Sequence, residues 1–194
     1  MAREPQFDQH QVLQRAMEQF WRFGYSGTSV QDLVAATGIN RASMYGAFGD
    51  KRSLFLGCLD QYIEEISARR QSLLSCAGPA PAVIRGYFDD LLATSLQDRQ
   101  HLGCLLTNSA LEIAPHDEEV NRRLKRRLLD LEQTFQSLIQ RGQSEGDIPA
   151  DRDPRQIARF LVSSIQGIRV MARLGPKPQM LKDIVRVAMQ SLAD

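Results

Sequence analysis

Apolar residues recur along almost the whole chain at the three- and four-residue spacing of an α-helix. In residues 8–24, Leu13, Ala16, Met17, Phe20 and Trp21 follow the series i, i+3, i+4, i+7, i+8. No stretch shows the alternation of apolar and polar residues that marks a half-buried strand. The sequence therefore predicts an all-α fold.

Turn and capping residues divide this pattern into about nine helices. Gly24, Gly38 and Gly49 are placed to end helices, and Ser29 with Asp32 has the spacing of a capping box. The segment 141–153, which contains Gly142, Gly146 and Pro149, is expected to be a loop. The predicted helices cover residues 8–24, 29–37, 40–47, 51–74, 82–97, 103–114, 117–141, 154–174 and 178–192.

A chain of 194 residues can hold one or two small domains with a proper hydrophobic core. We expect a first domain over residues 1–50 and a larger one over residues 51–194. The net charge of +1 argues neither for nor against nucleic-acid binding, so any such binding must come from a local patch.

The cysteine and histidine content excludes several site classes. Cys58, Cys76 and Cys104 are an odd, sparse set that predicts no disulfide framework and a reducing compartment. His101 and Cys104 lack the further ligands of a zinc site, and the sequence has no phosphate loop or nucleophile–base spacing. With no signal-like N-terminus and no run of ~20 apolar residues, we expect a cytoplasmic protein without membrane, metal or cofactor partners.

The segment 28–51 has the pattern of a helix, a tight turn and a second helix. Gly38 would let the two helices cross steeply, as in a helix-turn-helix, whose second helix enters the major groove of DNA. The second helix keeps only Met44 and Phe48 for the core. The residues left on or near its outward faces are Asn40, Arg41, Ser43, Tyr45 and Gly46.

This segment resembles the signature of the TetR family of transcriptional regulators. The matching residues are Thr28, Ala35, Gly38, Ile39, Met44, Tyr45, Phe48 and Lys51. The match is specific over about residues 8–55 and extends more weakly over the whole chain. The resemblance implies an N-terminal three-helix DNA-binding domain and a larger helical ligand-binding and dimerisation domain. The alternative is that residues 8–55 are only a small helical core.

The resemblance also implies roles in binding double-stranded DNA. Tyr45 and Lys51, with the hydroxyl or amide of Thr28 and Ser29 at a helix N-terminus, would hold phosphates. Small residues at 42, 46 and 47 leave few long side chains, so methyl contacts or DNA shape can carry more of the specificity. The candidates for base edges are Gln31, Asn40, Arg41 and Ser43, and Gly46 completes the candidate DNA-binding set.

The last two predicted helices are apolar on more than one side. Phe160 and Leu174 widen the stripe formed by Ile157, Leu161 and Ile165, and such helices need a second partner surface. The resemblance implies that they pair with their symmetry mates in a homodimer. The two recognition helices would then lie ~34 Å, or a multiple, apart on a palindromic operator. A monomeric core is the alternative.

Residues 103–112, GCLLTNSALE, resemble a segment of a TetR subgroup that includes repressors sensing electrophiles through a cysteine. Cys104, Asn108 and Glu112 are spaced i, i+4, i+8 and would share a face that could line a ligand cavity. The nearby helix N-terminus would lower the pKa of Cys104. A buried, inert thiol is the alternative. The candidate effector-binding residues are Tyr62, Phe88, Cys104, Asn108 and Gln166.

The leading functional hypothesis is an effector-controlled repressor, released from palindromic operator DNA by a small molecule. The resemblance leaves repression and activation open. A helical small-molecule carrier or enzyme without DNA binding is the alternative, and the salt dependence of nucleic-acid affinity separates the two. The basic run Arg122, Arg123, Lys125, Arg126 and Arg127 is expected to be a solvated helix face, with a second anion-binding surface as the alternative.

Overall fold

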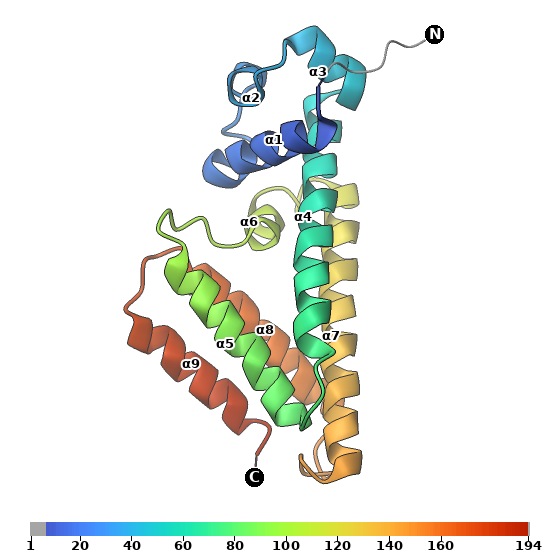
Figure 1. Cartoon of the computed structure of the whole chain (residues 1–194), viewed down its shortest axis with the longest axis vertical. Coiled ribbons are helices and arrows are strands. Elements are labelled where there is room, and N and C mark those ends of the chain that lie inside the picture. Colours follow the sequence, from blue (N-terminus) through green and yellow to red (C-terminus); the bar gives the residue numbers. More distant parts are fainter. Residues whose placement is uncertain (1–6, 194) are drawn as a thin grey trace.

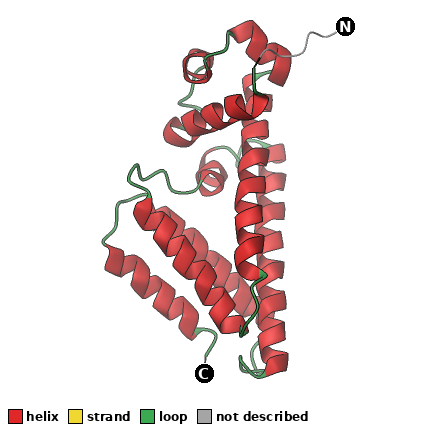
Figure 2. Ribbon diagram, viewed as in Figure 1, coloured by secondary structure: helices red, strands yellow, loops and turns green. Residues whose placement is uncertain are grey.

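A computed structural model describes residues 7–193, and within them the chain forms nine helices and no strand (Figure 2). The all-α prediction is confirmed. The helices are α1 (Gln9–Phe23), α2 (Val30–Thr37), α3 (Arg41–Phe48), α4 (Lys51–Leu74), α5 (Ala80–Gln97), α6 (Leu105–Glu112), α7 (Glu118–Glu145), α8 (Pro154–Ala172) and α9 (Pro178–Gln190).

Polar side chains begin the first four helices. Asp8, Ser29, Asn40 and Asp50 each accept hydrogen bonds from backbone N–H groups of the turn that follows. The predicted capping box is present: Ser29 Oγ accepts from Asp32 N, and the Asp32 carboxylate accepts from Ser29 N. These caps set the starts of the short helices α2 and α3, whose own length is too small to make them stable.

The seventh helix is longer than predicted, because Gly142 does not break it. A Cβ added at Gly142 would lie 2.8 Å from Ile148 Cδ1 and 2.9 Å from Ala80 Cβ, so this glycine allows close packing inside α7. The helix ends instead at Gly146, whose φ of 81° is left-handed. Residues 142–145 therefore leave the predicted loop and join the helix.

The helices form a small head on an elongated body (Figure 1). Helices α1, α2 and α3 make the head. Helix α4 runs from the head along the body beside α7, and α8 packs against α5, α7 and α9. The short helix α6 lies between the head and the α5, α8 and α9 layer, which gives it contact with both parts (Figure 1).

Two hydrophobic clusters hold this arrangement together. One lies in the body, between α5, α7, α8 and α9, and includes Phe88, Phe135 and Ile165. The other joins the head to α4, α6 and the start of α7, and includes Phe20 and Phe55. Apolar packing therefore continues across residue 50, where a domain boundary is predicted. None of the described helices is long and apolar enough to cross a membrane.

Candidate functional site

Helices α2 and α3 meet at a tight turn with the geometry expected of a helix-turn-helix. Gly38 ends α2 with φ 76° and ψ 7°, a left-handed conformation that glycine adopts without strain. Leu33 and Met44 are buried between the helices and α1 and α4. The opposite face of α3 is therefore free to face a partner.

Arg41 and Tyr45 form a pair on the outward face of α3. Arg41 is exposed, its Nη2 lies 3.4 Å from the Tyr45 hydroxyl, and its Cζ lies 5.2 Å from the centroid of the tyrosine ring. Gly46, the residue after Tyr45, is exposed, and an added Cβ there would meet nothing within 4 Å. Nothing within the described part of the chain therefore covers this stretch of the α3 backbone.

The side chains of Asn40 and Thr28 make hydrogen bonds within the protein that the sequence did not indicate. Asn40 Oδ1 accepts from Ser43 N at 2.8 Å and caps α3, which fixes the side chain and leaves its amide nitrogen as a free donor for a base edge. Thr28 is fully buried, and its hydroxyl donates to Gly24 O at 2.7 Å. The Thr28 hydroxyl cannot hold a phosphate in this conformation, which corrects that expectation.

The start of α2 offers fewer free donors than predicted. The hydroxyl and N–H of Ser29 both bond to Asp32, at 2.6 Å and 2.7 Å. These bonds lower the pKa of Asp32 and keep a negative charge at this end of α2. Gln31 is exposed in the first turn, where helical N–H groups lack intrahelical partners. Its side chain and its own N–H group remain available to a phosphate or base, whereas the N–H of Asp32 already donates to Ser29 Oγ.

Lys51, the first residue of α4, is positioned by an aromatic ring. Its Nζ lies 4.3 Å from the centroid of Tyr25, which packs against Phe20 and Phe55. A cation held over a ring loses less freedom on binding a phosphate. Tyr25 could not be identified from the sequence, because nothing in its spacing places it beside Lys51.

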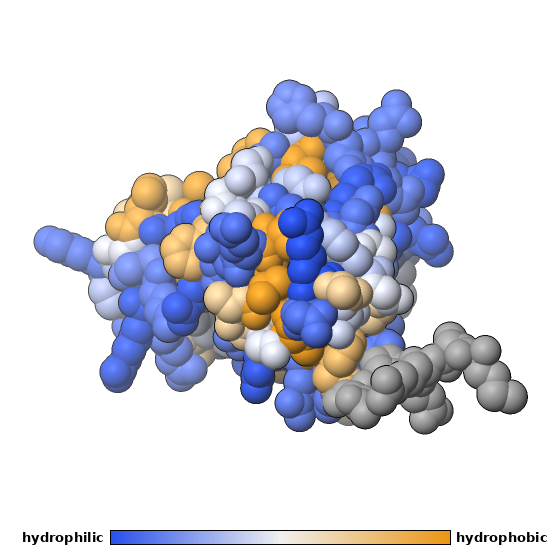
Figure 3. Space-filling model, turned by 90° about the horizontal axis from the view of Figure 1, so that it is seen from above, coloured by the Kyte–Doolittle hydropathy of each residue, from blue (hydrophilic) through white to orange (hydrophobic). Residues whose placement is uncertain are grey.

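Seen from the head end, the surface is mainly hydrophilic around a smaller hydrophobic strip (Figure 3). That distribution suits an interface with phosphates and base edges, which is polar and wet.

Glu112 joins α6 to the head. Its carboxylate accepts hydrogen bonds from the N–H groups of Tyr25, at 3.2 Å, and Ser26, at 2.8 Å. A Cβ at Gly24, where φ is 78°, would lie 2.8 Å from Glu112 Oε2. Trp21 adds a second link, because its Nε1 donates to Leu102 O at 3.1 Å. We call these contacts the α6–head link. They direct Glu112 away from the cavities of the body, so the shared polar face with Cys104 that spacing suggested does not form.

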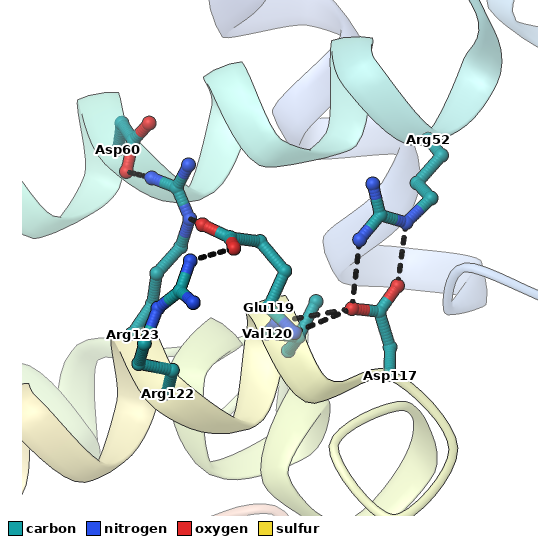
Figure 4. Close-up of polar contacts among 7 residues, drawn as sticks. All are labelled: Arg52, Asp60, Asp117, Glu119, Val120, Arg122 and Arg123. Atoms are coloured by element: carbon teal, nitrogen blue, oxygen red, sulfur yellow. Dashed lines mark hydrogen bonds and ion pairs between the residues drawn. The ribbon is translucent and has the colours of Figure 1, made fainter.

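An ion-pair network ties α4 to α7 just below the head (Figure 4). Arg52 donates to both carboxylate oxygens of Asp117, at 2.6 Å and 2.9 Å, and Asp117 also caps α7. The Arg52 hydrogen bonds hold the pKa of Asp117 at about 2. Arg123 pairs with Asp60 and Glu119, so this member of the basic run is not simply solvated.

Cys104 lies in a buried cluster at the start of α6. Its Sγ is 3.2 Å from Arg169 Nη1 and 3.6 Å from the Tyr62 hydroxyl, and the residue is 3% exposed. Burial alone would raise the pKa of Cys104, but the Arg169 guanidinium and the N–H of Thr107 outweigh it and lower the pKa. Burial raises the pKa of Cys58, which has no such neighbours.

Two adjoining cavities open beside this cluster. The first, of about 440 Å³, is lined by Tyr62, Cys104 and Arg169 among others, and we call it the thiol cavity. The second, of about 290 Å³, lies between α4, α6, α7 and α8, and we call it the arginine cavity. Ile66, Arg70, Tyr87 and Arg169 line both.

The five candidate effector residues divide between these cavities and the core. Tyr62 and Cys104 line the thiol cavity, and Gln166 lines the arginine cavity, where it accepts from Thr107 Oγ1 at 2.8 Å. Phe88 lines neither, because it is fully buried against Phe135. Asn108 lines neither as well, since it faces the head side of α6 and donates to Leu102 O.

Comparison with known proteins accounts for both halves of the chain. Residues 12–58 match the model of the tetR family of bacterial regulatory proteins, and residues 80–188 match that of the tetracyclin repressor-like C-terminal domain. The transcriptional regulator YezE of Bacillus subtilis is 34% identical over 193 residues, covering 99% of this chain and all of YezE. The repressor ComR of Escherichia coli is 32% identical and covers 92% of this chain and 85% of its own.

The fold agrees with solved structures. A cysteine-substituted form of the TetR family regulator CifR, solved with 26-base-pair double-stranded operator DNA, superposes with a TM-score of 0.87. It is 31% identical and covers 97% of this chain and 98% of its own. With the family signature, the all-helical architecture and full-length relatives in agreement, the chain belongs to the TetR family and is a helix-turn-helix transcriptional regulator.

Proposed function

We propose that the protein is a transcriptional repressor that binds palindromic operator DNA as a homodimer and is released by a small-molecule effector. The observation that carries DNA binding is the outward face of α3, where Arg41 and Tyr45 stand beside the open backbone at Gly46. The similarity to CifR, whose structure was solved with double-stranded operator DNA, supports DNA binding by this chain.

A DNA-selection assay on the purified protein tests the proposal. A palindromic site, bound with an affinity that falls steeply as salt rises, is the expected result, because phosphate contacts release counterions. Absence of sequence-specific binding at low salt, with the protein folded and reduced, would favour the carrier alternative.

The exposed face of α8 supports the homodimer. On α8, Phe160 and Val170 are 45% and 42% exposed, although they are large and apolar, and Leu174, in the turn just after the helix, is 74% exposed. Gly167 lies on the same face, and an added Cβ there would meet nothing within 4 Å. The absence of a side chain at Gly167 therefore serves no contact within the described chain, and it suits close approach of a partner helix. Helix α9 adds Val187 and Met180, at 53% and 38% exposure.

Replacing Gly167 with leucine is expected to convert the dimer to a monomer. The new side chain points into open space, so the monomer keeps its fold, but it would occupy the room of the partner helix. Sedimentation velocity measures the oligomeric state, and circular dichroism checks that the variant is folded. Gly86→Leu, on α5, is the matched control, because its added Cβ also meets nothing within 4 Å. A Gly167→Leu variant that stays dimeric would contradict this interface.

The Cys104 cluster supports an electrophile as one class of effector. A lowered thiol pKa increases the thiolate fraction, and the thiolate is the nucleophile. Cys104 lines the thiol cavity, which provides the approach for a small reagent. It also directly precedes α6, so an adduct on its sulfur would push against the helix that carries Glu112.

Replacing Arg169 with methionine is expected to move alkylation of Cys104 to higher pH, by about one unit or more. The guanidinium stabilises the thiolate, so its loss raises the thiol pKa, and the thiolate then forms only at higher pH. Peptide mapping by mass spectrometry after timed iodoacetamide treatment measures the rate at each pH. Cys58, whose pKa is raised by burial, is the internal reference. Identical pH profiles in both proteins would rule out this role for Arg169.

A further inference from the structure

Three arginine side chains from three different helices line the arginine cavity. They are Arg70 of α4, Arg127 of α7 and Arg169 of α8. The rest of the wall is mainly apolar and includes Leu106, Ala110, Leu124 and Leu131. All three residues are half-buried, and charges that are withdrawn from water in proteins are normally paired.

Only one of these arginines has a short contact with an acidic group. Arg169 is held by the Cys104 sulfur, and this attraction raises its pKa although burial alone would lower it. Arg70 and Arg127 make no ion pair within residues 7–193, and Nη1 of Arg70 is buried without a hydrogen-bond partner there. Burial lowers the pKa of both, and the charge of Arg70 lowers that of Arg127 further.

The charges around the cavity favour an anionic ligand. Asp130 favours the charged forms of Arg70 and Arg127 without forming an ion pair with either within residues 7–193, and the Cys104 sulfur contacts Arg169. The guanidinium groups of Arg70 and Arg127 are therefore open to an acidic partner. The thiol cavity shares Arg70 and Arg169 but not Arg127, and its own Arg69 is already paired with Asp90 at 2.6 Å.

We propose that the arginine cavity binds a small organic anion, a carboxylate on an apolar body. The carboxylate would lie between Arg70 and Arg127, whose planar guanidinium groups suit two-point contacts with carboxylate oxygens. The apolar body would lie against Leu106, Leu124 and Leu131. This inference names an effector class for the proposed repressor, and its effector role rests on that function, but binding itself does not require DNA.

Isothermal titration calorimetry on the full-length protein tests the site, with octanoate as the probe and octanamide as its neutral counterpart. We expect octanoate to bind at least about tenfold more tightly, because a hydrogen bond from a guanidinium to a carboxylate is stronger than one to a neutral amide. Arg127→Gln should lose about tenfold or more in affinity for octanoate. Arg126→Gln, at the exposed neighbouring position on α7, should bind octanoate as the parent does.

The proposal is overturned if octanamide binds as well as octanoate, or if no carboxylate from hexanoate to decanoate binds the folded protein. Equal affinity in the parent and in Arg127→Gln would also overturn it, and circular dichroism shows whether that variant is folded. Octanoate binding that leaves operator affinity unchanged supports the anion site and contradicts an effector role for it. Failure to find an operator does not affect the calorimetry, so the two proposals fail separately.

Discussion

Replacing Arg41 with alanine is expected to weaken operator binding by about ten- to a hundredfold and to leave the fold unchanged. Arg41 is exposed at the first position of α3, and its one described polar contact is with Tyr45. A two-point contact of arginine with guanine contributes about 1–3 kcal/mol of discrimination. The loss should therefore be largest for the selected operator and smaller for non-specific DNA. Fluorescence anisotropy with both DNAs at fixed salt measures it.

Two further variants distinguish a contact with a base from a general effect of positive charge on DNA affinity. Arg22→Ala removes an exposed cation in the last turn of α1, away from α3, and should change operator affinity much less. Tyr45→Phe keeps the ring under Arg41 but removes the hydroxyl, so it should weaken specific and non-specific binding together if that hydroxyl holds a phosphate. Equal losses in Arg41→Ala and Arg22→Ala would show that Arg41 does not read a base.

Replacing Glu112 with glutamine is expected to uncouple the body from the head. The carboxylate accepts from two backbone N–H groups, and a neutral amide with a single oxygen cannot reproduce both bonds. The amide protons of Tyr25 and Ser26 should then exchange with solvent about tenfold faster or more. Hydrogen exchange followed by NMR measures these two amides directly.

The same variant should lose most of its response to modification of Cys104. In the parent we expect alkylation to weaken operator binding by about five- to a hundredfold, within the usual range of coupling between sites. In Glu112→Gln that ratio should fall close to one, because the Glu112 contacts of the α6–head link are lost and only the Trp21–Leu102 hydrogen bond remains. Glu118→Gln, at an exposed position in the first turn of α7, is the matched control. If alkylation weakened operator binding by Glu112→Gln as much as by the parent, the effect of Cys104 modification would reach the head by another route, for example along α4.

Much of the head could be predicted from local sequence. The capping box of Ser29, the left-handed turn at Gly38 and the buried positions of Leu33 and Met44 depend on residues a few positions apart. The sequence also separated the outward residues of α3 from the buried ones. It did not show that Asn40 is used as a cap or that Thr28 is fully buried, because those depend on which neighbouring group is within reach.

The effector region was harder to predict for the same reason. Helical spacing places Cys104, Asn108 and Glu112 in one row, but Cys104 precedes α6 in an extended conformation with φ −119°. Consequently Cys104 lines a cavity, Asn108 donates to the carbonyl of Leu102, and Glu112 accepts from the head. Arg70, Arg127 and Arg169 are far apart in sequence, and only the packing of α4, α7 and α8 brings them to one cavity.

The helices and the turn between α2 and α3 could be predicted from periodicity, caps and turn residues, because they depend on contacts within about one helical turn. The family could be predicted from a short signature. The partner of each polar side chain was decided by tertiary packing. Glu112 reaches Tyr25 and Ser26 across 87 and 86 positions, and Arg169 reaches Cys104 across 65. A helical repeat states which residues share a face, but it carries no information about which other helix that face will meet.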